Sequence, residues 1–474
     1  RSSAASDVYK RQAYQCALMH LHIIGIGGTL MSGIARLAKE TGHEVTGCDQ
    51  AIYPPVSIEL EKLGIKVVEG FDENQKQLQP DLYVVGNVAT RGMGIIEYLL
   101  NEQIPFVSGP EWLEKNVLKY KQILAVSGTH GKTTTASMLA FILQEAGKRP
   151  SWLIGGVPEN LAVSSHYEEN SPYFVIEADE YDTAFFDKRS KFVHYHPDTL
   201  IINNLEYDHA DIFANLSAVQ WQFHQLLRIV RQKGQIIYRA NDPAIEQLLD
   251  MGVWTPTLPF ASTEGFHIKS QNQGNQGFSI FEANKEITFV QWSLFGKYNE
   301  NNALSALLAA RRAGVDLAEG ARILSRFKNV KRRMERKGEI GGITVYDDFA
   351  HHPTAITSAI AALKSTLKPT QRLIAIVEPR SNTLKMGCLK NAFISSLCEA
   401  DKVFVYTGDV HWDLKESLNS LGKKTQSFKN FNGLLKAILQ EAKSGDVLLV
   451  MSNGSFQGIH SLLLQALEKK HVRK

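Results

Sequence analysis

The sequence predicts an α/β protein whose parallel sheets are covered by helices on both faces, divided into two or three domains. The chain has 474 residues, which is more than one ordinary domain contains. Short apolar runs alternate with helical patterns over most of the chain, as they do in βαβ units. In two of these units a glycine-rich turn connects the strand to the helix, at residues 25–28 and at residues 128–131.

Composition narrows the class of protein. Hydrophobic residues make up 44% and charged residues 21% of the chain, as in soluble globular proteins. The net charge is 52 − 49 = +3, so no global field favours nucleic acid or an anionic membrane. No apolar run approaches the ~18 residues of a transmembrane helix. The four cysteines form no paired motif, which favours a reducing cytoplasm.

Residues 1–18 are expected to be a non-native tail. They lack the apolar core of a signal peptide. Met19 directly precedes the first apolar run and is a natural start. The fold is therefore predicted from residue 19 onward.

The first glycine-rich turn lies in a block predicted to span residues 19–117. A strand at 19–24 leads into the turn, a helix follows at 33–41, and Asp49 follows the end of the next strand, predicted at 43–48. This is nearly the dinucleotide-binding fingerprint, in which an acid about 20 residues downstream binds a ribose hydroxyl. The third glycine is replaced by Leu30, so a plain packing turn remains an alternative. Another strand is predicted at 82–85.

The second turn opens a block predicted to span residues 118–330. A strand at 122–127 precedes Gly-Thr-His-Gly-Lys-Thr-Thr, and a helix is expected at 134–146. Backbone N–H groups of such a turn bind phosphates, the lysine adds a positive charge, and the threonine hydroxyl can reach Mg²⁺. Val126 stands where the full motif has its first glycine. Two phosphate-binding turns in one chain suggest an enzyme that joins two molecules using ATP.

The remaining elements complete this block and a third one. Strands are predicted at 173–177, 199–203 and 235–238, antiparallel hairpins at 266–295, and a helix at 302–313. The third block, 331–474, again alternates. Its strands are expected at 343–346, 372–377, 402–406 and 446–451, and its helices at 354–364 and 389–400.

Metal-binding side chains are expected at two strand ends. Glu177 ends the strand at 173–177 and begins the run Glu-Ala-Asp-Glu. A carboxylate near a phosphate-binding turn suits a bridging Mg²⁺, although a solvated acidic loop is the alternative. His209 lies a few residues beyond the strand at 199–203, on the same side of the sheet, which favours a metal role.

Several runs together resemble one enzyme family. They are Gly-Thr-His-Gly-Lys-Thr-Thr at 128–134, Glu-Ala-Asp-Glu at 177–180, Asn-Leu-Glu-Tyr-Asp-His at 204–209, Tyr-Asn-Glu-Asn-Asn-Ala-Leu at 298–304 and Asp-Asp-Phe-Ala-His-His-Pro-Thr at 347–354. In this order they resemble the Mur ligases, the ATP-dependent amide-forming ligases of the peptidoglycan pathway. The resemblance covers residues 19–474 and implies three domains. These are a Rossmann-like UDP-binding domain, a P-loop ATPase-like central domain and a Rossmann-like C-terminal domain for the acceptor peptide.

The resemblance also implies residue roles. The residues expected to bind ATP are Gly128, Thr129, His130, Gly131, Lys132, Thr133, Thr134, Asn299, Asn302, Arg333 and Asp348. Mg²⁺ ligands are Thr133, Glu177 and His209, and the catalytic set is Lys132, Glu177, His209 and Arg333. UDP-sugar contacts fall to Gly25, Gly27, Gly28, Met31, Ser32, Asp49 and Asn87, and acceptor contacts to His352, Arg380, Ser381 and Asn382.

Two stretches indicate a branch of the family. Residues 185–194 and 377–385 look like murein peptide ligases, which attach the tripeptide L-alanyl-γ-D-glutamyl-meso-diaminopimelate to UDP-N-acetylmuramate. Alanine-adding relatives have arginines where this chain has Ser381 and Leu384. Some Mur ligases use a carbamylated lysine after the Asp-His motif. No lysine lies between His209 and Lys233 here and His224 is near the expected spacing, so no carbamate is expected.

Three other features are expected to be structural. The basic run 328–337 lacks the interleaved aromatic residues of a nucleic-acid site. His194 and His196 have the spacing of a metal pair on a strand, without an evident third ligand. Of His351 and His352, one is expected to face substrate and the other to be packed.

The sequence thus predicts a cytoplasmic tripeptide ligase of peptidoglycan recycling that uses ATP and Mg²⁺. We expect a monomer or weak homo-oligomer, without nucleic-acid or membrane partners, that serves cell-wall biogenesis, cell shape and cell division. The nearest alternative uses L-alanine as acceptor. A nicotinamide-dependent oxidoreductase and a nucleotide-gated binding module are alternatives of other classes.

Overall fold

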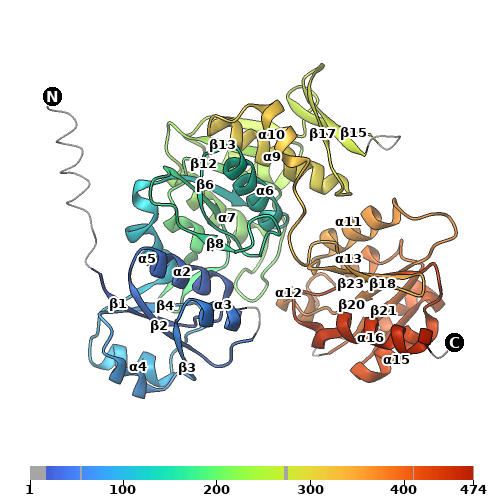
Figure 1. Cartoon of the computed structure of the whole chain (residues 1–474), viewed down its shortest axis with the longest axis horizontal. Helices are drawn as coiled ribbons and strands as arrows, with labels where there is room; N and C mark the ends of the chain where they lie inside the picture. Colours follow the sequence, from blue (N-terminus) through green and yellow to red (C-terminus); the bar gives the residue numbers. More distant parts are fainter. Residues whose placement is uncertain (1–17, 54–55, 272–275, 409, 473–474) are drawn as a thin grey trace. The chain divides into compact units, whose positions relative to one another are not determined.

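The computed structural model describes residues 18–53, 56–271, 276–408 and 410–472 (Figure 1). The expectations for residues 1–17 and for the loop at 272–275 lie outside the described residues. The chain forms two compact units. The first contains residues up to 125 with 148–155 and 163–198, and the second contains 126–147, 156–162 and 199–474.

The first unit is built on a five-stranded parallel sheet with strand order β3-β2-β1-β4-β5. Its strands are β1 (His20–Ile24), β2 (Glu44–Asp49), β3 (Lys66–Glu69), β4 (Leu82–Val85) and β5 (Phe106–Ser108). Its helices are α2 (Thr29–Glu40), α3 (Val56–Lys62), α4 (Gly94–Asn101) and α5 (Gly109–Asn116), with short 3₁₀ turns η1 (Glu73–Leu78) and η2 (Leu118–Tyr120). Four of the five residues of β1 are buried, as expected for a parallel strand covered on both faces.

Further strands of this unit come from residues 151–190. They are β7 (Ser151–Leu153), β8 (Ser165–His166), β9 (Tyr173–Glu177) and the hairpin β10 (Asp182–Ala184) and β11 (Asp187–Ser190). β9 pairs in parallel with β7, which pairs antiparallel with β8. The 3₁₀ turn η3 (Lys191–His194) follows the hairpin.

His194 ends the 3₁₀ turn η3 and His196 lies just beyond it, so the two residues are not a pair on a strand. Both imidazoles face carboxylates. His194 Nε2 lies 3.0 Å from Asp187 Oδ2, and His196 Nε2 lies 3.2 Å from Glu114 Oε1.

The second unit begins within β6 (Gln122–Ser127), whose last two residues belong to it. Here β12 (Thr199–Ile202), β13 (Gln235–Arg239), β14 (Thr257–Phe260) and β15 (Phe266–Gln271) run parallel, and β16 (Gly277–Glu282) and β17 (Lys285–Gln291) add antiparallel strands. The predicted hairpins are therefore confirmed. The helices are α6 (Lys132–Glu145), α7 (Leu216–Ile229), α8 (Pro243–Asp250), α9 (Lys297–Arg312) and α10 (Leu317–Leu324).

A six-stranded sheet of order β18-β19-β23-β20-β21-β22 forms the C-terminal part of this unit. Its strands are β18 (Glu335–Ile340), β19 (Ile343–Asp348), β20 (Leu373–Val377), β21 (Lys402–Tyr406), β22 (Thr425–Phe428) and β23 (Val447–Met451). Only β18 is antiparallel to its neighbour. The helices are α11 (Pro353–Lys364), α12 (Asn382–Lys385), α13 (Lys390–Ser396), α14 (Leu414–Leu418), α15 (Phe431–Glu441) and α16 (Ile459–Val472), with 3₁₀ turns η4 (Asn419–Lys424) and η5 (Phe456–Gly458).

Alternate residues of β20 pack into two hydrophobic cores. Leu373, Ala375 and Val377 share one core with α11 and α13. Ile374 and Ile376 share the other with α15 and α16, and Figure 1 shows these helix pairs on opposite faces of the sheet. The predicted architecture of helices on both sides is thus confirmed here. None of the described helices combines the length and hydropathy needed to cross a bilayer.

Candidate active site and nucleotide-binding turns

The first glycine-rich turn connects β1 to α2 and is held by its own chain. The N–H groups of Gly25 and Ile26 donate to the Cys48 carbonyl at 2.8 and 3.1 Å. Gly27 N–H donates to Asp49 Oδ2 at 2.8 Å. Gly25 has a φ of +83°, and a Cβ there would lie 2.4 Å from Val88 Cγ1. Glycine is therefore required at this position by backbone conformation and by space.

The carboxylate of Asp49 fixes this turn. Its Oδ1 accepts from Gln50 N–H at 2.8 Å, while Oδ2 is bonded to Gly27. Both oxygens thus have a backbone donor, and binding of a ribose hydroxyl by Asp49 stays a prediction. The bond to Gly27 gives the acid at the end of β2 a structural role that does not depend on the third glycine, which Leu30 replaces.

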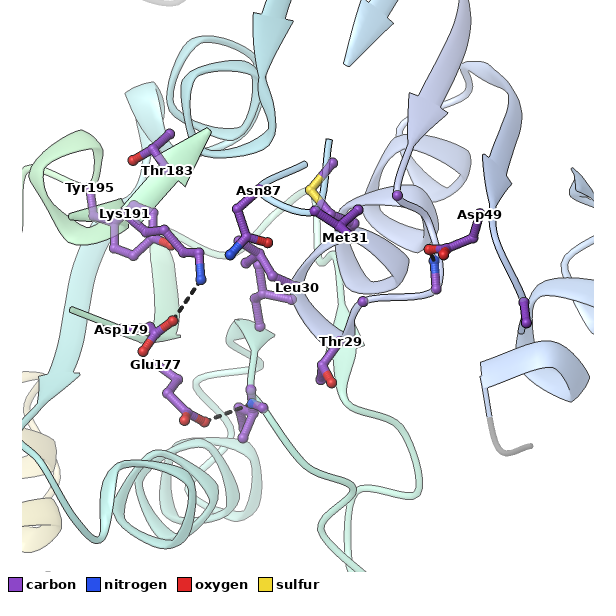
Figure 2. Close-up of a pocket in the computed structure, with 18 residues that line it drawn as sticks. Thr29, Leu30, Met31, Asp49, Asn87, Glu177, Asp179, Thr183, Lys191 and Tyr195 are labelled. Atoms are coloured by element: carbon purple, nitrogen blue, oxygen red, sulfur yellow. Dashed lines mark hydrogen bonds and ion pairs between the residues drawn. The ribbon is translucent and has the colours of Figure 1, made fainter. Parts of the chain in front are cut away.

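A cavity of about 500 Å³ lies against the turn, entirely within the first unit (Figure 2). The start of α2 forms one wall, and residues 153–155 and 177–195 form the other. The predicted UDP-sugar residues that line it are Gly25, Gly27, Gly28, Met31, Asp49 and Asn87. Ser32 is not a lining residue, since it is buried and its hydroxyl donates to the Thr29 carbonyl at 3.1 Å.

The N-terminus of α2 supplies the cavity with backbone donors. Thr29, Leu30 and Met31 line the cavity and form the first turn of the helix. The first N–H groups of a helix have no intrahelical acceptor, and Gly28 offers no side-chain cap. Such an end binds anions, which suits a nucleotide diphosphate.

The opposite wall carries charged side chains (Figure 2). Glu177 Oε2 accepts from Gly155 N–H at 2.7 Å. Lys191 Nζ pairs with Asp179 Oδ2 at 2.7 Å, and the Lys191 side chain is only 9% exposed. Burial, with the nearby carboxylates of Asp179 and Glu177, raises the pKa of Tyr195. This wall therefore holds a neutral phenol, a positive charge and two acids.

Sequence reasoning missed Lys191, Tyr195 and Thr183 as cavity-lining residues. Residues 185–194 resemble one branch of the family, but no motif marks which of their side chains line the cavity. The sequence places Asp179 in the acidic run after β9 and does not indicate its pairing with Lys191.

The second turn connects β6 to α6 and has glycines in the left-handed region. Gly128 has a φ of +130° and Gly131 a φ of +78°. A Cβ on Gly131 would lie 2.6 Å from Asn302 Oδ1, and one on Gly128 would lie 3.1 Å from the Asn204 carbonyl. These glycines allow Asn204 and Asn302 to pack against the turn.

Part of this turn keeps its N–H groups open. Thr129 and His130 donate to the carbonyl and side-chain oxygens of Asn204, at 3.3 and 2.8 Å. Within the described residues, the N–H groups of Gly128 and Gly131 have no acceptor. Lys132 Nζ donates to the Gly128 carbonyl at 2.8 Å, so its ammonium lies over the turn. The geometry is that of a phosphate-binding loop.

Arg333 reaches this turn from residues just before β18. Its Nη2 donates to Thr133 Oγ1 at 3.2 Å, and its guanidinium lies 4.8 Å from the ring centre of Phe349. The structure thus brings Arg333 to Thr133, another residue of the predicted ATP-binding set. Its role toward phosphates stays a prediction.

The other predicted ATP residues are mostly buried. Thr134 lies inside α6, and Asn302 lies against Gly131. Asn299 Nδ2 donates to the Phe295 carbonyl at 3.0 Å. Asp348 accepts from the N–H groups of Met334 and Ala350, both at 2.7 Å. Since each carboxylate oxygen of Asp348 holds a backbone group, its first function is to fix this turn, and ribose binding stays a prediction.

His209 follows β12 in the second unit with a φ of +55°. Its N–H donates to Asp208 Oδ1 at 2.8 Å. Thr383 Oγ1 donates to the same Asp208 oxygen at 2.6 Å and accepts from Ala210 N–H at 3.2 Å. No sequence pattern marks Thr383, whose hydrogen bonds connect the His209 segment to α12.

The predicted acceptor residues lie around α12 and α11. Arg380 is exposed and pairs with no carboxylate of the described residues, and its guanidinium covers Gly454. Ser381 accepts from Leu384 N–H at 3.4 Å as the N-cap of α12, and Asn382 begins that helix. His352 is buried with its Nε2 3.2 Å from the Tyr207 carbonyl. Neither His351 nor His352 is exposed.

Two of the three residues predicted for Mg²⁺, Glu177 and Thr133, suit a hard cation in chemical type. Glu177 offers a carboxylate on the cavity wall of the first unit. Thr133 offers a hydroxyl and His209 an imidazole, both in the second unit. Carboxylate and hydroxyl oxygens are ligands that Mg²⁺ prefers.

Three family models match the chain in succession. They describe the Mur ligase family catalytic domain at 20–121, the Mur ligase middle domain at 126–310 and the Mur ligase glutamate ligase domain at 332–454. Together they cover most of the chain. The chain belongs to the Mur ligase family.

Individual relatives within this family are similar over nearly full length. A UDP-N-acetylmuramate–L-alanyl-γ-D-glutamyl-meso-2,6-diaminoheptanedioate ligase of Escherichia coli (strain K12) is 48% identical over 453 residues, covering 95% of this chain and 99% of the relative. The crystal structure of a murein peptide ligase from Psychrobacter arcticus 273-4 is 43% identical, with a TM-score of 0.74 and coverage of 95% and 99%.

The Mur ligase architecture also extends to a more distant structure. A UDP-N-acetylmuramate–alanine ligase from Thermotoga maritima has a TM-score of 0.78 at 24% identity, covering 95% of this chain and 100% of that one. This match concerns the fold. It agrees with the α/β three-domain architecture predicted from the sequence.

Proposed function

We propose that this chain is an ATP-dependent ligase that joins L-alanyl-γ-D-glutamyl-meso-diaminopimelate to the carboxylate of UDP-N-acetylmuramate. The near full-length similarity to an E. coli ligase of that specificity, 48% over 453 residues, is the observation that carries this proposal. The two nucleotide-binding turns supply the matching chemistry.

The reaction needs an activated carboxylate. Transfer of the γ-phosphoryl group of ATP converts the carboxylate to an acyl phosphate and releases ADP. The amine of the peptide then attacks the acyl carbon, and phosphate leaves from a tetrahedral intermediate. Each step builds negative charge on oxygen, so preorganised positive groups and N–H donors accelerate it.

The second turn provides these groups. The open N–H groups of Gly128 and Gly131 and the ammonium of Lys132 face the phosphates of ATP. Arg333, anchored at Thr133, adds a second cation. Thr133 and His209 of the second unit and Glu177 of the first are retained as the residues that would hold Mg²⁺, which neutralises phosphate charge when bound.

The cavity beside α2 accommodates the uridine nucleotide. Its diphosphate lies at the N-terminus of α2, where Thr29 to Met31 offer N–H donors. Met31 and Asn87 line the same cavity, and Glu177 and Lys191 form the wall opposite them. We assign residues 19–117 to this domain, 118–330 to the ATP domain and 331–474 to the acceptor domain.

Arg380 is the proposed acceptor-recognition residue. It lies just after β20, is exposed and has no carboxylate partner in the described chain. A guanidinium binds a carboxylate through two parallel hydrogen bonds, and the meso-diaminopimelate side chain ends in one. Ser381 and Leu384 replace arginines of the alanine-adding relatives, which argues against L-alanine as acceptor.

The cellular role follows from this substrate. A tripeptide acceptor implies recycling of peptidoglycan fragments in the cytoplasm, in support of cell-wall biogenesis and cell division. We retain monomer or weak homo-oligomer as the expected state. A nicotinamide-dependent oxidoreductase is disfavoured because it has no use for the Lys132 turn.

The test compares acceptors. The purified chain is incubated with UDP-N-acetylmuramate, ATP and Mg²⁺, and with the tripeptide, L-alanine or no acceptor. ADP release and the mass of the nucleotide product are measured. We expect stoichiometric ADP and UDP-N-acetylmuramoyl-tripeptide with the tripeptide. Faster turnover with L-alanine refutes the acceptor assignment, and no ADP with any acceptor refutes the ligase.

A further inference from the structure

Two imidazoles and a carboxylate meet in the second unit outside the Mg²⁺ residues. His130 lies in the second glycine-rich turn, Glu206 follows β12, and His352 is the N-cap of α11. His130 Nε2 lies 3.6 Å from Glu206 Oε1, and His352 Nδ1 lies 3.6 Å from Glu206 Oε2. One ligand atom from each residue lies within 4.8 Å of the other two.

These separations fit metal ligands better than hydrogen bonds. A separation of 3.6 Å is too long for a hydrogen bond between nitrogen and oxygen. Nε2 of His130 is buried and has no hydrogen-bond partner among the described residues, which is costly for a polar atom. Ligands bound at about 2.0–2.1 Å in a tetrahedral site lie about 3.4 Å apart. Each imidazole nitrogen lies close to that distance from one carboxylate oxygen of Glu206, Oε1 for His130 and Oε2 for His352.

Neighbouring groups orient two of the three ligands, His352 and Glu206, as in metal sites. His352 Nε2 lies 3.2 Å from the Tyr207 carbonyl, which can only accept, so the proton is on Nε2 and Nδ1 carries a lone pair. Thr354 Oγ1 donates to Glu206 Oε2 at 2.6 Å. Metal-binding histidines and carboxylates are held by such outer contacts. The Thr354 N–H also approaches His352 Nδ1, at 3.4 Å, a long contact that a bound ion would replace.

We propose that His130, Glu206 and His352 bind a divalent transition metal of the Zn²⁺ class, separate from Mg²⁺. Two imidazoles and a carboxylate form a zinc-type ligand set that leaves a fourth position for water. Mg²⁺ is disfavoured here because it prefers oxygen ligands. The ion links the ATP turn to the start of α11, so its binding stabilises this part of the fold.

Co²⁺ is the probe for this site, because its visible absorption reports imidazole ligands in a four-coordinate site. The full chain is titrated with Co²⁺ in excess Mg²⁺, which occupies oxygen-rich sites. We expect one tight equivalent with visible bands, displaced by Zn²⁺. Glu206→Gln and His352→Gln are expected to weaken Co²⁺ binding at least tenfold. Two controls, His209→Gln and the remote His267→Gln, are expected to keep the bands.

Thermal unfolding provides a second readout on the same proteins. A ligand that binds only the folded state raises the unfolding temperature, so Zn²⁺ is expected to stabilise the wild type and both controls. The stabilisation is expected to be lost in Glu206→Gln and in His130→Gln. Circular dichroism checks that each variant is folded. A cluster variant that is not folded is replaced by another of the three cluster substitutions. Bands that persist in every cluster variant, or that vanish in His209→Gln, overturn the proposal.

Discussion

The two glycine-rich turns share a strand–turn–helix plan but differ in where their backbone donors go. In the first, the N–H groups of Gly25, Ile26 and Gly27 are bonded to Cys48 and Asp49 of the next strand. In the second, Gly128 and Gly131 keep open N–H groups within the described chain. Lys132 also lies over the second turn, whereas no lysine or arginine occurs in residues 25–32.

This difference indicates two kinds of nucleotide site. The N–H groups of the first turn are bonded within the protein, so this turn acts as a rigid support. We expect its ligand to bind instead at the N-terminus of α2 and the cavity wall beside it. A turn with open donors and a cation surrounds a highly charged triphosphate. The first site therefore suits a nucleotide that is only held, and the second suits one that transfers a phosphoryl group. The variants below test this comparison through substrate kinetics, stability and the Mg²⁺ requirement.

The largest effect is expected for Lys132→Ala. Removal of a charge aimed at the transferring phosphoryl group should lower kcat by at least about 10²-fold. Binding of UDP-N-acetylmuramate should be preserved. The matched control is Lys39→Ala, a lysine in the last turn of α2, which should behave as wild type. Steady-state kinetics and calorimetric binding distinguish these outcomes, and near-normal turnover of Lys132→Ala would remove the ATP assignment of the second turn.

Arg380→Lys extends the comparison to the third substrate. Loss of bidentate carboxylate binding should reduce kcat/KM for the tripeptide by about 1–3 kcal/mol, or roughly 5- to 150-fold. The KM values for ATP and UDP-N-acetylmuramate should barely change. The measurement is steady-state kinetics with each substrate varied in turn. A defect in ATP instead of peptide would show that Arg380 serves the nucleotide.

Gly131→Ala and Gly28→Ala compare how much a glycine-to-alanine substitution in each turn lowers the free energy of unfolding. Gly131 has a φ of +78°, and a Cβ there would meet Asn302 Oδ1 at 2.6 Å. Gly28 has a φ of −69°, and its nearest neighbour would lie 3.6 Å away. We expect Gly131→Ala to lose about 1–3 kcal/mol and Gly28→Ala less than about 0.5 kcal/mol. Urea unfolding measures both, and equal losses would contradict the conformational difference.

Glu177→Gln tests the metal prediction. The amide keeps the shape of the side chain but removes an anionic ligand, so the Mg²⁺ concentration for half-maximal rate should rise roughly tenfold. A Mg²⁺ titration at saturating ATP measures this shift. An unchanged titration would move the ligand role to Asp179 or Glu180.

The smallest expected effect concerns His22, which lies in the strand before the first turn. Its ring is fully buried between Thr46 and Gln75, and burial lowers its pKa to about 4. The unfolded chain therefore binds a proton below about pH 6.5 that the folded chain takes up only near pH 4. Stability should fall as pH drops through this window. Urea midpoints should decline less steeply in His22→Gln, and an equal slope in both proteins would contradict the assignment.

Strong local patterns made much of the fold predictable. The strands 82–85, 122–127, 173–177 and 402–406 were predicted with the bounds that the structure has. Each is an apolar run in a parallel sheet, where burial on both faces leaves little ambiguity. The helix α6 begins at Lys132 rather than 134, and α9 at Lys297 rather than 302, because their glycine N-caps carry no side-chain signal.

Elements formed by tertiary pairing were missed. The edge strand β18 has the sequence Glu-Arg-Lys-Gly-Glu-Ile, which shows no strand pattern and is a strand because it pairs with β19. The predicted helix at 389–400 is shorter, since α13 ends at Ser396. For the site, the sequence motifs correctly indicated the positions of both glycine-rich turns. The Lys191–Asp179 pair and the Thr383–Asp208 bond join distant segments and could not be read from spacing.

The account requires that ATP at the second turn phosphorylates the carboxylate of the sugar nucleotide. UDP-N-acetylmuramate labelled with ¹⁸O in both carboxylate oxygens tests this most directly, with the tripeptide as acceptor and mass spectrometry of the products. An acyl phosphate predicts one ¹⁸O in the released inorganic phosphate and the other in the new amide. Label in AMP, or phosphate without label, would contradict the account.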